Sequence, residues 1–191
     1  MPLFHIMIED ADAVRTYGIK MFNEFCCQGR KSIMKHYLHP GAYAEISGNA
    51  DHPSLRGTAY FYPVSSGGVL IETEVYGLPY EKVPPYGQFY GTHIHETEDC
   101  TLPFDKTGNH YNPENLPHPN HAGDLPPLLG NEGYAYSVVY TDRFELPDII
   151  GRSLIIHSAP DDFTTQPSGN SGVKIGCGII VEKIPFFHSS V

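Results

Sequence analysis

Residues Gly91 to Asp124 read GTHIHETEDCTLPFDKTGNHYNPENLPHPNHAGD, and this stretch decides how the rest of the chain is interpreted. It holds five of the chain's eleven histidines, one cysteine and several carboxylates. Alternate side chains of a β-strand share a face, so His93 and His95 can bind one ion from the same side. Further candidate ligands are His110, His118, His121, Asp124 and the downstream His157. Imidazoles suit copper and zinc, and three imidazoles with one carboxylate can form a tetrahedral zinc site.

The size and charge of the chain exclude several classes of protein. At 191 residues it can form one domain with its own core, and no segment is apolar over the roughly 18 residues that a membrane helix needs. The net charge of −10, with only twelve basic residues, argues against nucleic acid or an anionic membrane as a partner. A small anion can still be attracted by local positive charge, because salt screens fields beyond about 8 Å.

From Ala42 onward the apolar and aromatic residues recur with a period of two. Seven such stretches are separated by Gly, Pro, Asn and Asp clusters: 42–48, 57–63, 68–79, 88–96, 133–140, 152–157 and 173–182. About eight short strands without a convincing helix between them predict an all-β fold, an antiparallel barrel or sandwich. Two long connections, Glu96 to about Asn131 and Ser158 to Val173, leave the histidine-bearing strands and are predicted to be functional loops over one site.

Residues 1–40 are predicted to be an N-terminal extension ahead of a domain at 41–191. The extension has apolar residues at helical spacing: Val14, Tyr17, Met21 and Phe25. Three interpretations remain open, namely a short appended helix, a poorly ordered tail, or an upstream start with Met34 opening the true domain. Cys26 and Cys27 are expected to be reduced thiols without a function.

The N-terminus also bears on the compartment. It has no basic region ahead of its short apolar patch and no small-residue cleavage site, so no signal peptide is predicted. The expected compartment is the cytoplasm by default, with export as the expectation if the N-terminus is mis-assigned.

The chain from about Ala42 to Val181 resembles the copper/zinc superoxide dismutase family. The stretches that carry the resemblance are GTHIHE, GNHYNP, HAGDLP, GRSLIIH, APDDF and GNSGVKIGCGIIV, in the family's order along the chain. The resemblance implies a Greek-key β-barrel that binds copper and zinc. It also implies the reaction, in which superoxide is converted to dioxygen and hydrogen peroxide.

The resemblance assigns a role to each candidate ligand. The implied copper ligands are His93, His95, His110 and His157. The implied zinc ligands are His110, His118, His121 and Asp124, so that His110 would bridge the two metals. His110 is also the implied proton carrier of the reaction. The remaining histidines match nothing in the family and are interpreted as surface residues: His5, His36, His39, His52 and His188.

The resemblance also implies two supporting features. Cys100 and Cys177 match the family's intramolecular disulfide, with two free thiols as the alternative. Asp161 matches the aspartate that hydrogen-bonds one copper ligand and one zinc ligand, here His93 and His118. The neighbouring Asp162 is expected to face water.

Two departures from the family pattern concern activity and zinc binding. The family places an arginine four positions after its Gly-Asn pair to attract and dock superoxide, and Lys174 stands there in this chain. Lysine keeps the positive charge but loses the planar fork, so we expect anion steering to survive better than docking. His118 and His121 lie only three residues apart, in a zinc loop shorter than that of many relatives. Such a spacing can still bring two imidazoles onto one ion, so zinc binding is expected.

The sequence leaves two alternative functions open. One is a non-catalytic copper-binding or copper-delivery module on the same fold, favoured only by the missing arginine. The other is a zinc hydrolase, which is disfavoured because four candidate ligands would close the zinc site. A homodimer is compatible with the resemblance, but no part of the sequence selects a pairing surface.

Overall fold

The structure is a computed structural model that describes residues 39–80 and 88–183. By its contacts the chain divides into units at 1–39 and 40–191, and nearly all of the described residues belong to the second unit. The described residues do not include the stretch with helical spacing from Val14 to Phe25, nor Cys26, Cys27, His5, His36 and His188. The division of the chain at residue 40 into extension and domain therefore stays a prediction. Within the described part of the chain, no helix has the length and apolarity needed to cross a membrane.

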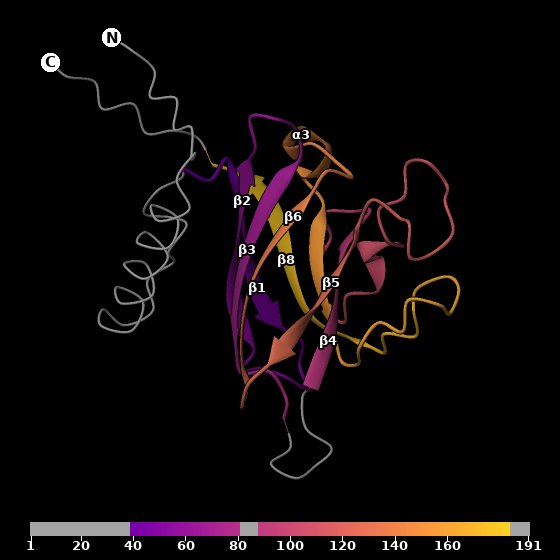
Figure 1. The fold of residues 1–191 in the computed structure, drawn as a ribbon. Coiled ribbons are helices and arrows are strands. Elements are labelled where there is room, and N and C mark those ends of the chain that lie inside the picture. The colour runs from indigo at the N-terminus through magenta and orange to yellow at the C-terminus, as the bar shows by residue number, and fades with distance from the viewer. Residues whose placement is uncertain (1–38, 81–87, 184–191) are drawn as a thin grey trace, which may run out of the picture. The chain divides into compact units, whose positions relative to one another are not determined.

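Eight antiparallel strands form one sheet that curls into a nearly closed barrel (Figure 1). The strands are β1 (Ala42–Gly48), β2 (Arg56–Pro63), β3 (Val69–Tyr76), β4 (Gln88–His95), β5 (Asp124–Gly130), β6 (Tyr134–Thr141), β7 (Ser153–His157) and β8 (Lys174–Glu182). Their spatial order is β5-β4-β7-β8-β1-β2-β3-β6, and a tight turn with a bridge between Asn131 and Tyr134 joins the two ends of that order. The predicted all-β antiparallel barrel is confirmed, and within residues 39–80 and 88–183 the only helical elements are two short turns, η1 (Asp105–Thr107) and α3 (Leu146–Ile149).

The predicted loop from Glu96 to Asn131 was wrong in its second part, because strand β5 occupies Asp124–Gly130. Pro126 and Pro127 masked this strand in the sequence, since proline cannot donate a hydrogen bond within a sheet. The strand tolerates them because its ladder is made with β4 alone. The functional loop therefore spans 96–123 and returns to the sheet at Asp124.

The inward-facing residues of the strands form one apolar core. Ala44 and Ile46 of β1, Phe61 of β2, and Ile94 and Leu154 from β4 and β7 are all essentially inaccessible to solvent. This is the alternation expected of strands with one face on a core. Since Ile94 points inward, its neighbours His93 and His95 point outward.

The outer face of β4, β7 and β8 carries the candidate site. His93 pairs with Ile155 in register, and His157 pairs with Lys174, so these side chains share one face of neighbouring strands. His93 also lies opposite Asp124, the first residue of β5. The connections 96–123 and 158–173 begin at the ends of β4 and β7, next to these side chains. The predicted site therefore lies outside the barrel wall.

A disulfide between Cys100 and Cys177 ties the loop after β4 to strand β8, as the sequence resemblance implied. The bridge packs with Phe104 and Ile155 in a small apolar cluster of its own, on the outer side of the wall. It links residues 77 apart in sequence, and closing a loop of that length stabilises the fold by about 4 kcal/mol in the chain-entropy model. The loop that carries His110 is thereby fixed at one end.

Candidate metal centre

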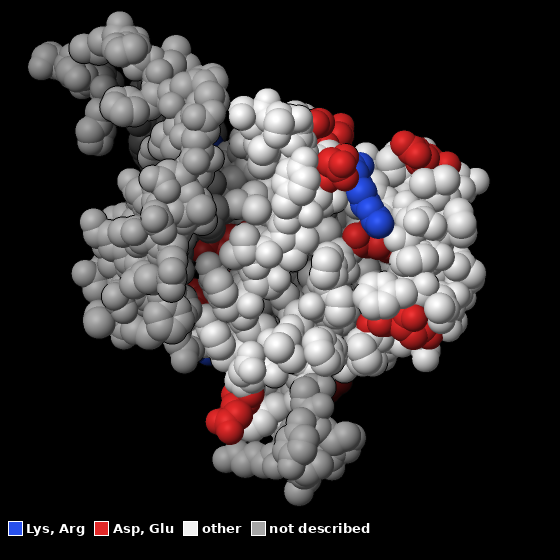
Figure 2. Space-filling view, in the orientation of Figure 1, with Lys and Arg blue, Asp and Glu red and all other residues white. Residues whose placement is uncertain are grey.

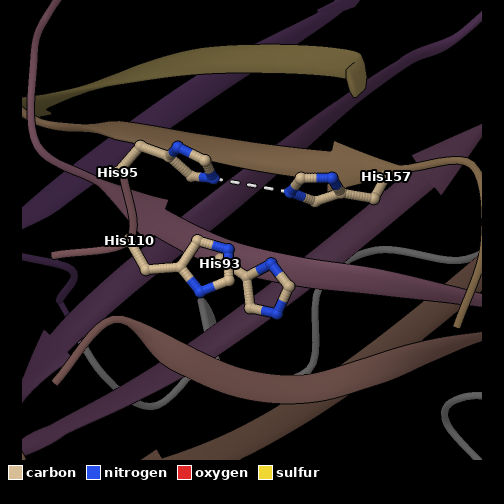
Figure 3. Close-up of side chains that lie close together, drawn as sticks. All are labelled: His93, His95, His110 and His157. Atoms are coloured by element: carbon tan, nitrogen blue, oxygen red, sulfur yellow. Dashed lines mark hydrogen bonds between the residues drawn. The ribbon is translucent and has the colours of Figure 1, made fainter. Parts of the chain in front are cut away.

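Four buried imidazoles converge beside strands β4 and β7 (Figure 3). They belong to His93 and His95 of β4, His157 of β7, and His110, which a bridge between residues 95 and 110 brings opposite β4. One ligand atom from each of the four lies within 4.8 Å of the others. The rings of His93 and His110 are stacked with centroids 3.9 Å apart, and Nε2 of His95 lies 3.4 Å from Nε2 of His157.

A second group of four shares His110 with the first. His110, His118, His121 and Asp124 each offer an atom within 4.8 Å of the others, and all four are buried. Nδ1 of His110 lies 2.7 Å from Oδ1 of Asp124. Every ligand that the sequence predicted therefore lies in the predicted group. Their binding of metal stays a prediction.

In four of these imidazoles, one of the two ring nitrogens lies within hydrogen-bond distance of an acceptor oxygen of the protein. Nε2 of His93 and Nε2 of His118 donate to the two oxygens of Asp161, at 2.8 and 2.9 Å. Nδ1 of His95 lies 2.9 Å from Gly108 O, and Nδ1 of His157 lies 3.3 Å from Gly172 O. Such acceptors orient metal-binding imidazoles and fix which nitrogen faces the ion.

The ring nitrogens that make no hydrogen bond are the ones that would bind a metal ion. Within the described part of the chain, four buried ring nitrogens make no hydrogen bond: His93 Nδ1, His110 Nε2, His118 Nδ1 and His121 Nδ1. Nδ1 of His118 and of His121 lie 3.1 and 3.3 Å from Asp124 oxygens, close but without hydrogen-bond geometry. A buried polar atom without a partner costs free energy, and a metal ion satisfies several such atoms at once. The donor set of nitrogens with one carboxylate fits copper and zinc.

Burial keeps the imidazoles of His95 and His157 neutral, which is the form that binds metal. Desolvation lowers the pKa of His95 to about 2 and that of His157 to about 3, outweighing their backbone hydrogen bonds. For Asp124, burial alone would raise the pKa, but the hydrogen bond from His110 and the nearby imidazoles outweigh it and lower it. The carboxylate is therefore ionised at neutral pH.

A cavity of about 540 Å³ opens onto the first group, and Lys174 lies in its wall with His95, His110 and His157. Among the described residues that line it, Lys174 carries the only formal positive charge and Glu96 the only negative one. The Lys174 ammonium lies 2.7 Å from Thr107 Oγ1 and 3.4 Å from the carbonyls of Phe104 and Gly108. Burial lowers the pKa of Lys174, and Asp105 opposes that effect.

The structure also places the residues that were expected to lie outside the site. Asp162 is exposed and accepts hydrogen bonds from Thr164 and Thr165 in a local turn, as a water-facing carboxylate would. His39 is exposed, and His52 lies beside Asn49, away from both groups.

Sequence reasoning did not identify several residues that support the site. Every residue has a backbone carbonyl, so residue type does not reveal that Gly108 O and Gly172 O contact imidazoles. Arg143 and Gln166, which contact the backbone of the zinc loop, lie outside every matching motif.

Comparison with known proteins gives one family and two kinds of relative. A family model described as copper/zinc superoxide dismutase (SODC) matches residues 55–180. The chain is 35% identical over 147 residues to a superoxide dismutase [Cu-Zn] of Deinococcus radiodurans, covering 65% of this chain and 76% of that protein. It is 28% identical over 179 residues to the human copper chaperone for superoxide dismutase, covering 84% of this chain and 62% of that protein.

A solved structure shares the fold. The structure described as the clock protein EA4 superposes with a TM-score of 0.62 at 29% identity. The match covers 77% of this chain and 98% of that one. It supports the barrel architecture found here.

Loss of the Asp161 carboxylate is predicted to weaken both groups at once. Asp161→Asn should lower the affinity for bound copper and zinc by about 10- to 100-fold, because an amide cannot accept from both His93 and His118. Metal retention against a chelator would measure this. Asp162→Asn, one residue away and exposed, is the matched control, and equal loss in both variants would contradict the assignment.

The metal-free protein is predicted to lose stability as the pH falls from about 6.5 toward about 3. Unfolded histidines take up protons near pH 6.5, whereas His95 and His157 take them up only at much lower pH, so protons favour the unfolded chain throughout this window. Each group contributes up to about 1.4 kcal/mol per pH unit. Urea unfolding after metal removal would measure the slope. His95→Gln should flatten it and His52→Gln should not; an unchanged slope in His95→Gln would contradict the prediction.

Proposed function

Because the chain belongs to the copper/zinc superoxide dismutase family, whose cofactors copper and zinc fit its two buried groups, we propose that it converts superoxide to dioxygen and hydrogen peroxide. In this proposal His93, His95, His110 and His157 hold copper. His110, His118, His121 and Asp124 hold zinc. The observation that carries the proposal is the buried ring of His110, which belongs to both groups.

The chemistry of the reaction is divided between the metal and the protein. Bound copper would supply one-electron redox chemistry, taking an electron from one superoxide and giving it to a second. The protein supplies position, charge and protons. Nε2 of His110 has no hydrogen-bond partner in the described part of the chain, and the residue lines the cavity. It can therefore take up one proton there and give it to the reduced substrate, and the second proton of hydrogen peroxide comes from solvent in the cavity. The other nitrogen of His110 is held by Asp124.

Lys174 supplies the local attraction for an anion. The domain is acidic, and Figure 2 shows a face that is mostly uncharged, with scattered acidic side chains and one prominent basic group. A positive charge in the cavity wall therefore matters for the approach of superoxide. The three ammonium donors of Lys174 already have three acceptors within 3.4 Å. Lys174 is thus better placed to attract the anion than to hydrogen-bond it.

A non-catalytic copper-binding or copper-delivery module is the second candidate. The similarity to the copper chaperone, and lysine in place of the family's arginine, favour it. The complete set of four imidazoles and the open cavity beside them favour catalysis. The zinc-hydrolase alternative receives no support, because the second group already contains four candidate ligands.

The proposal predicts dismutase turnover after metal loading. Full-length protein loaded with copper and zinc should bind one of each per chain and remove superoxide catalytically. Metal analysis with a superoxide assay would measure both. A copper carrier would bind copper with little turnover, and that result would replace the proposal with the second candidate.

Removal of the charge at Lys174 is predicted to slow the reaction and to weaken its salt dependence. Lys174→Gln should lower the rate at low salt by about tenfold, within the range known for electrostatic steering. The rate of Lys174→Arg should still fall as salt rises, because the charge is kept. Rates measured between low and high ionic strength would show this. An unchanged low-salt rate in Lys174→Gln would remove Lys174 from the mechanism.

A further inference from the structure

The segment that carries the three zinc-loop ligands, residues 117–124, is held from outside by two side chains. Arg143 lies in the connection between β6 and β7, and Gln166 lies in the connection between β7 and β8. We propose that Arg143 and Gln166 are positioning residues that fix the backbone of this segment and so govern retention of the zinc ion. The inference rests on the ligand set proposed above and extends it to residues outside that set.

The first anchor is a cation placed against backbone carbonyls. Nη1 of Arg143 lies 3.0 Å from Pro119 O and 3.1 Å from His121 O, with Asp124 O at 3.5 Å. The two hydrogens on this nitrogen serve the two nearer carbonyls, and the positive charge attracts the third. Hydrogen bonds from a charged donor are stronger than neutral ones. Two of the three carbonyls belong to candidate ligands, His121 and Asp124, so Arg143 orients the peptide groups of these ligands directly.

The second anchor is an amide that pairs with both backbone groups of one ligand. Nε2 of Gln166 donates to His118 O at 2.7 Å, and Oε1 of Gln166 accepts from His118 N at 3.0 Å. The same loop provides Asp161, which accepts from the ring of His118 at 2.9 Å. Backbone and ring of His118 are therefore both fixed by one neighbouring loop.

The segment has few hydrogen bonds of its own. Among the described residues, the hydrogen bonds within 117–124 run from Asn120 N to Pro117 O, from Asp124 N to His121 O, and from His121 N to the Asp124 carboxylate. The residues just before it, from Glu114 to Leu116, are exposed to solvent. Metal sites need their ligands held within about 0.5 Å of the productive geometry. Gly123 is also bonded through its backbone to Ile94 and Tyr111. Between His118 and His121 the backbone is held from outside by Arg143 and Gln166.

The test measures zinc release in the full-length, metal-loaded protein. Arg143→Gln and Gln166→Ala should each release zinc to a chelator about tenfold faster than wild type, the lower end of the range for residues that orient metal ligands. Copper retention should stay within about twofold of wild type. Gln166→Glu keeps the acceptor for His118 N but places a carboxylate against His118 O, so its release should be at least as fast as that of Gln166→Ala. Cobalt at the zinc site should show an altered visible spectrum in the variants, because the ligand geometry loosens.

Two controls separate positioning from general damage. Arg56→Gln removes an exposed arginine that contacts Ser54 O and the Tyr76 ring. Thr164→Ala alters the Gln166 loop at a hydroxyl that contacts Asp162. Both should release zinc at the wild-type rate. Thermal unfolding of the metal-free variants should match metal-free wild type within a few degrees.

Each possible result supports or overturns the inference. Faster zinc release with normal copper retention supports it. Zinc release at the wild-type rate overturns it, and so does equal loss of both metals together with a destabilised metal-free fold. Wild-type protein that takes up neither zinc nor cobalt would overturn the proposed zinc ligands and the inference with them.

Discussion

The structure depends on the different contacts that the two ring nitrogens of a buried imidazole make. His93, His95, His118 and His157 are packed away from water, so each ring needs a partner for both nitrogens or loses free energy. Fixed acceptors, two of them oxygens of the single carboxylate of Asp161, hold one nitrogen and leave the other facing the remaining candidate ligands of its group. The strands, the disulfide and both long loops serve to keep these acceptors in place.

The relation between the two long connections follows from this constraint. The connection 158–173 contributes Asp161 to one ligand of each group and contacts the backbone of His118 through Gln166. The connection 96–123 carries His110, His118 and His121 and is tied to the barrel by the disulfide. The two groups are therefore coupled through shared residues and through a shared loop.

Much of the architecture could be predicted from the sequence, for physical reasons that also explain the failures. Period-two patterns from Ala42 onward gave the strands because each has one face on the core. Strand β5 was not predicted because its two prolines are typical of loops. A strand can contain them here only because β5 pairs with a neighbour on one side. The histidines could be named from their side-chain chemistry, and Asp161 from the family resemblance. The sequence could not reveal the contacts made by Gly108 O, Gly172 O and Gln166, because these contacts depend on where the folded backbone passes.

The opposite orientations of Ile94 and its two histidine neighbours determine where the chain can change length. A deletion or insertion of one residue within β4 would invert the strand, sending Ile94 toward the polar pocket and the imidazoles into the hydrocarbon interior. Such a change would destroy core and site together. In the surface connections, side chains do not alternate between two faces, so a connection can lose or gain a single residue without turning a strand over. Divergence in this architecture is therefore expected to be a matter of loop length over a barrel wall of constant register.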